Sequence, residues 1–296
     1  MTIKTLTKLA VNSRVQALAI FLLLLLPFFI ASFVVLSGSL PFWYDPARDF
    51  LLAWDNLSKV TLIGPVTGIP GIFYGPYWIW LISMGLLISK DPKITVFLIQ
   101  TIPYILILPG IFLLQKNFSR LSLASVWLLF MFGTGIHYAT MPWNPHIAPI
   151  FLIFIFLLIA HINLSALHQR EYRSAVLLGV LLGLVVNVHI SFGVVAVLGT
   201  AIYLLTSFMT IDRKKRKKFT SELFWSQALF CLLTTLGLLV TFTPFFLFEI
   251  RHNFIQTKSL LATLTANHPV VGLKGLSHQE IIRQFFLSAT QFVGVG

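Results

Sequence analysis

Long apolar runs separated by short polar segments dominate the pattern of this chain. The runs cover residues 15–37, 72–89, 94–115, 121–140, 147–164, 174–188, 190–209 and 226–248. Most of them lack period-2 alternation and are apolar nearly all round, which is typical of helices embedded in lipid. At about 20 residues per crossing, the pattern predicts an all-α polytopic membrane protein, with residues 1–296 forming a single membrane domain.

The run 72–89 differs from the others because it is short and carries Tyr74, Tyr77, Trp78 and Trp80 at one end. Aromatic side chains of this kind favour the membrane–water interface. If 72–89 does not cross, 13 of the 21 Lys and Arg residues lie on the side of the N-terminus, and if it crosses only 9 do. Because cytoplasmic loops are enriched in Lys and Arg, we predict that the other seven runs cross and that 72–89 is an interfacial or re-entrant helix on the outer face.

This topology fixes the expected layout of the chain. The run Val15–Leu36 is too long for the apolar part of a signal peptide, so it is predicted to be a retained first helix with a cytoplasmic N-terminus. Residues 15–248 form a seven-helix core with an outer loop at 38–93, in a cytoplasmic (inner) membrane. Residues 249–296 are predicted to begin as an outer loop and to end in the start of a further helix.

The composition excludes several classes of protein. Only 10% of the residues are charged and 57% are hydrophobic, whereas a soluble domain carries about 25% charged residues. The net charge of +12 comes from basic residues in short segments between apolar runs, so it reflects topology and argues against nucleic acid as a partner. Cys231 is the only cysteine, which excludes an internal disulfide and Cys-type metal spacing.

Five polar segments lie on the outer side in this topology, and they favour a single extracytoplasmic site. They are 41–49 (PFWYDPARD), the Gly75-Pro76 corner, 141–146 (MPWNPH), 187–191 (NVHIS) and 249–253 (EIRHN).

Each segment also has a simpler interpretation, which the sequence leaves open. Asp45 and Asp49 are consistent with ordinary loop acids before a helix at 47–58, and Trp143-Asn144-Pro145 with an interfacial helix start. His189 near a membrane end is more often a packing residue than a catalyst, and Arg251 with His252 could anchor a helix end at lipid headgroups. His137, His146 and His252 have no metal-ligand spacing.

Taken together, the outer segments contain the chemistry that a polyprenyl-phosphate sugar requires. Asp45 or Asp49 could act as general base towards an acceptor hydroxyl. Arg48, Arg251 and His252 could neutralise the phosphate, since a guanidinium binds two oxygens at once. Aromatic residues such as Trp43, Tyr44 and Tyr77 could stack against a sugar or an isoprenoid.

The order of these segments resembles the GT-C glycosyltransferases, the superfamily of protein O-mannosyltransferases and lipid A aminoarabinose transferases. A first helix precedes an outward Y-D-x-A-R type motif, a small-Pro-aromatic segment, an outward loop that opens a helix, and a later basic loop. In this chain they are Tyr44-Asp45-Pro46-Ala47-Arg48, Gly75-Pro76-Tyr77-Trp78, Trp143-Asn144-Pro145 and Phe248-Glu249-Ile250-Arg251-His252.

The resemblance implies an outward active site with Asp45 as the catalytic or metal-associated acid, and hence a divalent metal as a candidate cofactor. Many relatives carry a second acid where this chain has Asn144, so metal dependence is left open. Relatives are usually longer, and the chain is expected to correspond to the conserved module alone.

The predicted function is transfer of a sugar from a polyprenyl-phosphate donor to a lipid, glycan or protein acceptor. Asp45 is the expected base and Asp49 the second candidate, while Arg48, Arg251, His252, Tyr77, Trp143, Asn144 and His189 are expected to bind substrate. A transporter or flippase for a lipid-linked substrate and a non-catalytic membrane subunit are the alternatives.

Overall fold

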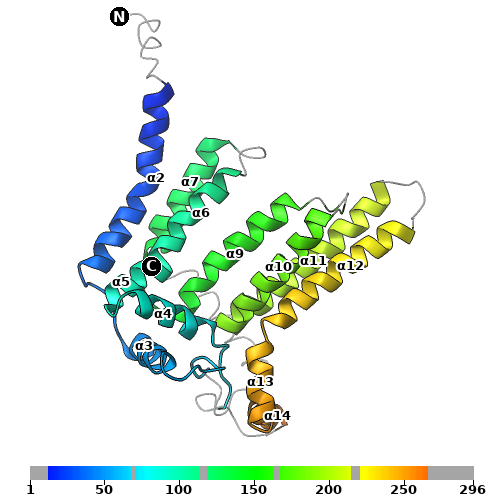
Figure 1. The fold of residues 1–296 in the computed structure, drawn as a ribbon. Coiled ribbons are helices and arrows are strands. Elements are labelled where there is room, and N and C mark those ends of the chain that lie inside the picture. Colours follow the sequence, from blue (N-terminus) through cyan, green and yellow to red (C-terminus); the bar gives the residue numbers. More distant parts are fainter. Residues whose placement is uncertain are drawn as a thin grey trace, which may run out of the picture. The chain divides into compact units, whose positions relative to one another are not determined.

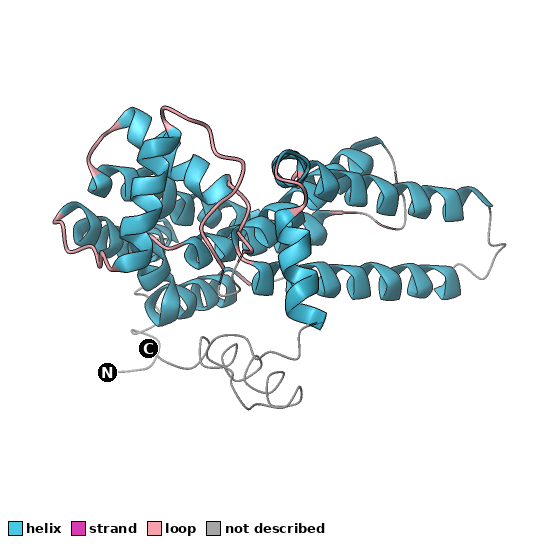
Figure 2. Cartoon of the chain, turned by 90° about the horizontal axis from the view of Figure 1, so that it is seen from below, coloured by secondary structure: helices cyan, strands magenta, loops and turns pink. Residues whose placement is uncertain are grey.

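The computed structural model describes residues 13–67, 71–113, 119–162, 164, 167, 169–214 and 221–265. Within these ranges the chain is built from helices and loops, and the only β pairing is an isolated bridge between Val66 and Phe73 (Figure 2). The all-α prediction is therefore confirmed for the part of the chain that is described.

Four described helical segments are long and apolar enough to cross a bilayer: Ser122–Thr140, Asn144–His161, Glu171–Val188 and Ile190–Thr210. A fifth is the pair Phe224–Val240 and Thr243–Arg251, if its 50° bend is counted within one span. Shorter apolar helices occupy Ile20–Leu36, Tyr77–Ile88 and Pro92–Leu108. These helices indicate a membrane protein with four or five candidate spans, and the count of seven stays a prediction.

The chain divides into two compact units, 1–48 with 84–160 and 49–83 with 161–296, and the division passes through two helices. These helices are α3 (Tyr44–Asn56) and α4 (Tyr77–Ile88). The predicted helix at 47–58 is thus present as α3, but it begins earlier, because a proline such as Pro46 and an acid such as Asp45 are both favourable in a first turn.

The first unit consists of α2 (Ser13–Leu36), a long helix at 92–113, a second helix at 120–140, and α9 (Asn144–His161). The first of the two middle helices comprises α5 (Pro92–Val96), the π-helical turn η1 (Phe97–Thr101) and α6 (Ile102–Leu113). The second comprises α7 (Arg120–Phe130), the π-helical turn η3 (Met131–Gly135) and α8 (Ile136–Thr140). Trp127 anchors α7 to α2, since its buried indole donates to the carbonyl of Leu24 at 3.1 Å.

The π-helical turn η1 places two polar side chains against the end of α8. Thr101 donates from Oγ1 to the carbonyl of Ala139 at 2.8 Å, and Gln100 donates to the carbonyls of Tyr138 and Met141. The last carbonyls of a helix lack partners within the helix, so these two side chains satisfy them in an apolar setting. They thereby fix the loop that leads to Trp143 and α9.

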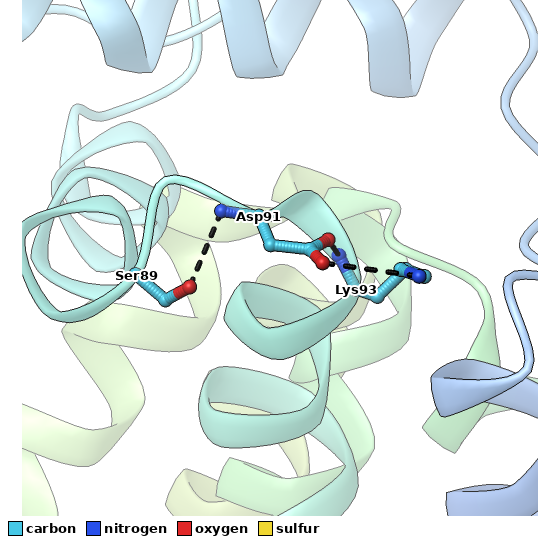
Figure 3. Close-up of polar contacts among 3 residues, drawn as sticks. All are labelled: Ser89, Asp91 and Lys93. Carbon is cyan, nitrogen blue, oxygen red and sulfur yellow. Dashed lines mark hydrogen bonds and ion pairs between the residues drawn. The ribbon is translucent and has the colours of Figure 1, made fainter.

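The break between α4 and α5 is set by a local capping motif (Figure 3). Asp91 accepts from the backbone N–H of Lys93 at 2.8 Å, while its own N–H donates to Ser89 Oγ at 3.2 Å. Pro92 follows at the first helical position, where its missing N–H has no cost. The chain therefore starts a new helix at 92, as the pattern of apolar runs predicts.

The second unit is organised around α10 (Gln169–Val188), α11 (Ile190–Lys214) and α12 (Ser221–Val240), which lie side by side (Figure 1). The apolar runs 174–188 and 190–209 form a helical hairpin, in which His189 is the single residue between α10 and α11. Glycines bring α10 and α12 into backbone contact: a Cβ on Gly179 would collide with the carbonyl oxygen of Thr234, and one on Gly237 with that of Val176. Close approach through small residues is how helices associate in lipid.

The segment 71–76 contacts the turn of this hairpin. Gly75 donates to the carbonyl of Asn187 at 2.8 Å, and Gly64 donates to the carbonyl of Tyr74 at 2.8 Å. A Cβ on Gly75 would collide with the Asn187 side chain, whose amide is itself bonded to Gly183 and Thr241. Glycine at 75 is therefore required by close packing.

After α12 the chain bends into α13 (Thr243–Arg251), and α14 (Ile255–Thr265) follows (Figure 1).

Candidate functional site

The second unit contains a basic pocket of about 270 Å³ between the segment after α3 and the last turn of α13. The first wall is the continuous segment Lys59–Ile63, and the second wall is formed by Phe248, Arg251 and His252. Lys59, Arg251 and His252 are exposed, so the pocket opens to its surroundings. Two of the substrate-binding residues predicted from the sequence, Arg251 and His252, therefore line one pocket.

The first wall is held in place by hydrogen bonds from α3 and α4. The buried Asn56 donates to Ser83 Oγ at 2.9 Å and accepts from the Thr61 N–H at 2.8 Å. Trp80 donates from its indole to the Thr61 carbonyl, also at 2.8 Å. Because both the N–H and the C=O of Thr61 are engaged by side chains of flanking helices, the wall is preorganised.

The second wall ends in an unusual turn. Asn253 and Phe254 have φ of 54° and 59°, and the left-handed region is rare for a bulky residue such as Phe. Phe254 donates its N–H to the carbonyl of Glu249 at 2.8 Å, closing the end of α13. The turn reverses the chain directly after Arg251 and His252.

Glu249 explains why this turn is stable. Its buried carboxylate accepts from the N–H groups of Gln256 and Thr257 at 3.0 and 2.9 Å, and from Thr257 Oγ1 at 2.6 Å. These are the first N–H groups of α14, which favour an acceptor with negative charge. Burial raises the pKa of Glu249, but the hydrogen bonds from Thr257 and Gln256 and the nearby His252 outweigh it and lower the pKa below its usual value. The ionised carboxylate thus caps the start of α14.

The positive charges of the pocket are not neutralised by acids that line it. Among the described residues, neither Arg251 nor Lys59 forms an ion pair, and no acid lines the pocket. His252 stacks on the Phe248 ring at 4.0 Å between centroids, with Nδ1 2.8 Å from the Phe248 carbonyl. Two cations and an imidazole around an acid-free hollow form an environment suited to an anion.

The size of the pocket favours a small anionic group. Sites for drug-sized ligands usually enclose about 300–1,000 Å³, and this one has about 270 Å³. It can hold a phosphate with part of an attached group, but not a whole lipid-linked sugar.

Three other predicted residues lie in the second unit, each with a packing contact. Asp49 has no exposed surface and accepts from the Trp78 indole at 2.9 Å. Tyr77 donates from its hydroxyl to the Thr241 carbonyl at 2.6 Å. His189 stacks on Tyr74 with centroids 5.9 Å apart.

The environment of His189 also changes its ionisation. Burial lowers its pKa from 6.5 to about 4, so the imidazole is neutral at pH 7. Its buried Nδ1 has no hydrogen-bond partner in the part of the chain that the structure describes.

The first unit brings two predicted outer segments together. Trp43 and Trp143 meet edge to face with centroids 5.9 Å apart, which joins 41–49 to 141–146. Asp45 pairs with Arg48 at 3.0 Å, and the Arg48 guanidinium lies 5.7 Å from the centre of the Tyr44 ring. Asn144 is buried, with 3% of its surface exposed, at the start of α9.

Sequence reasoning missed two residues of the basic pocket region, Lys59 and Glu249. In the sequence, Lys59 is an isolated basic residue. Only the tertiary fold shows that Lys59 and Arg251 line the same pocket. Glu249 carried no capping signal, because it lies inside α13, six residues before the start of α14. Within the described residues, no group of His, Cys, Asp and Glu side chains is arranged to hold a metal ion.

Comparison with protein-family models, with curated proteins and with solved structures finds no match to this chain.

Proposed function

We propose that the protein is a membrane glycosyltransferase that moves a sugar from a polyprenyl-phosphate donor to an acceptor on the outer face of the cytoplasmic membrane. The observation that carries the proposal is the acid-free basic pocket lined by Lys59, Arg251 and His252. Its second wall includes the last turn of α13, which forms a bent apolar helix pair with α12. A lipid-linked phosphate needs this combination, because its chain stays in hydrocarbon while its charge requires cations at the surface.

The pocket would act on the leaving group. When the bond between the sugar C1 and the phosphate oxygen breaks, the bonding electrons pass to that oxygen, and the phosphate gains one negative charge. Arg251 can bind two phosphate oxygens in parallel, and Lys59 adds a second positive charge. Since the negative charge grows along the reaction, these contacts strengthen towards the transition state and lower the barrier.

The acceptor hydroxyl attacks C1 and must lose its proton, for which the resemblance to GT-C enzymes proposes Asp45. The carboxylate of Asp45 is partly exposed and pairs with Arg48 at 3.0 Å, so an acceptor hydroxyl can reach it. Asp49 is the second candidate, and its full burial against Trp78 means that the helix would have to open before it could receive a proton. The same resemblance also proposes a divalent metal bound at Asp45.

The proposed topology has seven crossings, a cytoplasmic N-terminus and 72–89 on the outer face. The length of α4 supports a helix that does not cross: it has 12 residues, which span about 18 Å, against about 30 Å for the hydrocarbon core. The distribution of Lys and Arg supports the same arrangement.

A transfer assay in reconstituted vesicles tests the proposal. The protein is supplied with a radiolabelled pool of polyprenyl-phosphate sugars, and wild type is compared with Asp45→Asn and Arg251→Ala. We expect both variants to insert normally and to lose transfer by at least about 100-fold for the base and 10-fold for the phosphate ligand.

The outcomes separate the candidate functions. Equal transfer by wild type and Asp45→Asn removes Asp45 as the base and points to Asp49. Absence of transfer by the wild-type protein contradicts the glycosyltransferase proposal and favours a transporter of a lipid-linked substrate or a non-catalytic membrane subunit.

A further inference from the structure

The chain bends by 50° between α12 and α13, the helix that carries the second wall of the basic pocket. Pro244, the second residue of α13, has no N–H and cannot donate to the carbonyl of Val240, four residues earlier. The Thr243 hydroxyl donates to that carbonyl instead, and the Thr241 hydroxyl donates to the carbonyl of Leu238, both at 2.7 Å. Hydroxyl groups commonly satisfy the carbonyls that a proline break leaves open in a membrane helix. Both bonds lie within one segment, so they do not fix the direction of α13 relative to the rest of the unit.

Two side chains from other helices meet this bend at Thr241. Tyr77, the first residue of α4, donates from its hydroxyl to the Thr241 carbonyl at 2.6 Å. Asn187, near the end of α10, donates to the Thr241 hydroxyl at 3.3 Å. The bond from Tyr77 is the shorter one, and it acts on the backbone itself. It therefore constrains the point at which α13 leaves α12.

The same turn of α4 holds the first wall of the basic pocket. The Trp80 indole donates to the carbonyl of Thr61, which belongs to that wall, at 2.8 Å. Tyr77 and Trp80 meet edge to face, with ring centroids 5.3 Å apart. One turn of α4 thus binds the first wall directly and the second wall through the bend.

The segment before α4 contacts the other end of α13. Phe73 meets the Phe248 ring with centroids 6.3 Å apart, and its N–H donates to the side chain of Gln256 at 2.8 Å. Phe248 lines the pocket. Residues 73–80 therefore contact α13 at both of its ends.

The length of α13 makes the position of the pocket cations sensitive to the bend. It has 9 residues and is therefore about 13 Å long. Arg251 is its last residue, and His252 follows. A rotation of about 10° at the bend would move this end by about 2 Å, which is enough to break a hydrogen bond to a bound phosphate oxygen.

We propose that Tyr77 is a positioning residue of the basic pocket. Its hydrogen bond to the Thr241 carbonyl sets the direction of α13 and so holds Arg251 and His252 at a fixed distance from Lys59. The inference rests on the proposed function for the identity of the ligand, a polyprenyl phosphate. The positioning itself can be measured without a ligand.

Pulsed electron paramagnetic resonance between two spin labels measures the width of the pocket. Asp55→Cys places one label on α3, next to the first wall, and Ile250→Cys places the other on α13. Both positions are exposed, and Cys231→Ser removes the native cysteine. We expect Tyr77→Phe to shift the mean distance by about 2 Å. The matched variant Tyr203→Phe, 40% exposed on α11, should leave the distance unchanged.

The affinity of a polyprenyl phosphate in nanodiscs links this geometry to the pocket. Loss of one hydrogen bond should weaken binding by about 5-fold in Tyr77→Phe, whereas Tyr203→Phe should bind like wild type. In an Arg251→Ala background, Tyr77→Phe should weaken binding by less than about twofold, because the group that it positions is absent.

An unchanged label distance in Tyr77→Phe would overturn the proposal, and so would a shifted distance with unchanged affinity. Additive losses from Tyr77→Phe and Arg251→Ala would also overturn it and would show that Tyr77 contacts the ligand itself. If the wild-type protein binds no polyprenyl phosphate, the proposed function fails, and the label distance alone decides whether Tyr77 positions α13.

Discussion

The helix pairs α10–α12 and α7–α9 differ in how closely their helices approach each other. In the first pair, Gly179 and Gly183 on α10 and Gly237 on α12 let the backbones touch. In the second pair, large side chains such as Trp127 and Phe156 face each other and leave a groove of about 480 Å³. Since lipid is as apolar as these side chains, apolar character alone does not bring helices together in a membrane. Small residues decide where two helices touch, and a groove remains where they are absent.

The largest expected effect comes from a side chain placed in the tight pair. Gly179→Leu should cost about 3 kcal/mol or more, because the new side chain would collide with the Thr234 carbonyl and the backbone of α12 cannot retreat. The folded yield in detergent and the thermal melting temperature measure the effect.

Gly199→Leu is the matched control. Gly199 lies on α11, and a Cβ there has nothing within 4 Å, so the variant should melt within a few degrees of wild type. Similar losses in both variants would show that the sensitivity reflects leucine in general and not contact between α10 and α12.

The second effect concerns the turn that closes the α10–α11 hairpin. Burial lowers the pKa of His189 from 6.5 to about 4, so between these values the unfolded chain binds a proton that the folded chain does not. Stability should therefore fall as pH decreases from 6.5 to 4, by at most about 3 kcal/mol, and remain constant above 6.5. His189→Phe should remove this pH dependence, measured as melting temperature against pH, and a slope that persists in the variant would assign it to other groups.

A smaller effect is expected at the turn between α13 and α14. Glu249→Gln removes the charge that caps α14 and should cost about 1 kcal/mol at neutral pH. Because the folded pKa of Glu249 is lowered, the wild-type advantage is present above the unfolded pKa and disappears as pH falls through the folded value. Chemical denaturation at pH 7 and pH 3 measures both, and an equal difference at the two pH values would contradict the charge-based explanation.

The smallest effect should come from a larger side chain in the groove between α7 and α9. Val126 lines the groove and is 65% exposed, so Val126→Phe should change stability by only about 0.5 kcal/mol. A loss comparable to that of Gly179→Leu would show that α7 and α9 are as tightly packed as α10 and α12.

The sequence predicted the helices well because hydropathy is local. The apolar runs at 121–140, 147–164 and 190–209 correspond to helices with similar bounds, and the turn at His189 is where the pattern placed it. The close contact between α10 and α12 was not predicted, although Gly179 and Gly183 have the spacing of a contact motif of helices in lipid. The π-helical turn η1 was not predictable, since Gln100 and Thr101 find their carbonyl partners only in the tertiary fold.

The candidate site was predicted only in part. Arg251 and His252 lie together because they are neighbours in sequence, and the Trp43–Trp143 contact joins two segments that topology placed on one side. Lys59 could not be assigned, because its partner residues are about 190 positions away and pocket geometry comes from the tertiary fold.

Binding of a polyprenyl phosphate to the basic pocket is the most direct test of the account. Its Kd is measured in nanodiscs for wild type, Lys59→Ala and the control Lys258→Ala, which removes a cation on α14 outside the pocket. We expect Lys59→Ala to weaken binding by about 10-fold and Lys258→Ala to leave it within about twofold. Equal affinity of all three proteins would contradict the assignment of this pocket to the lipid phosphate.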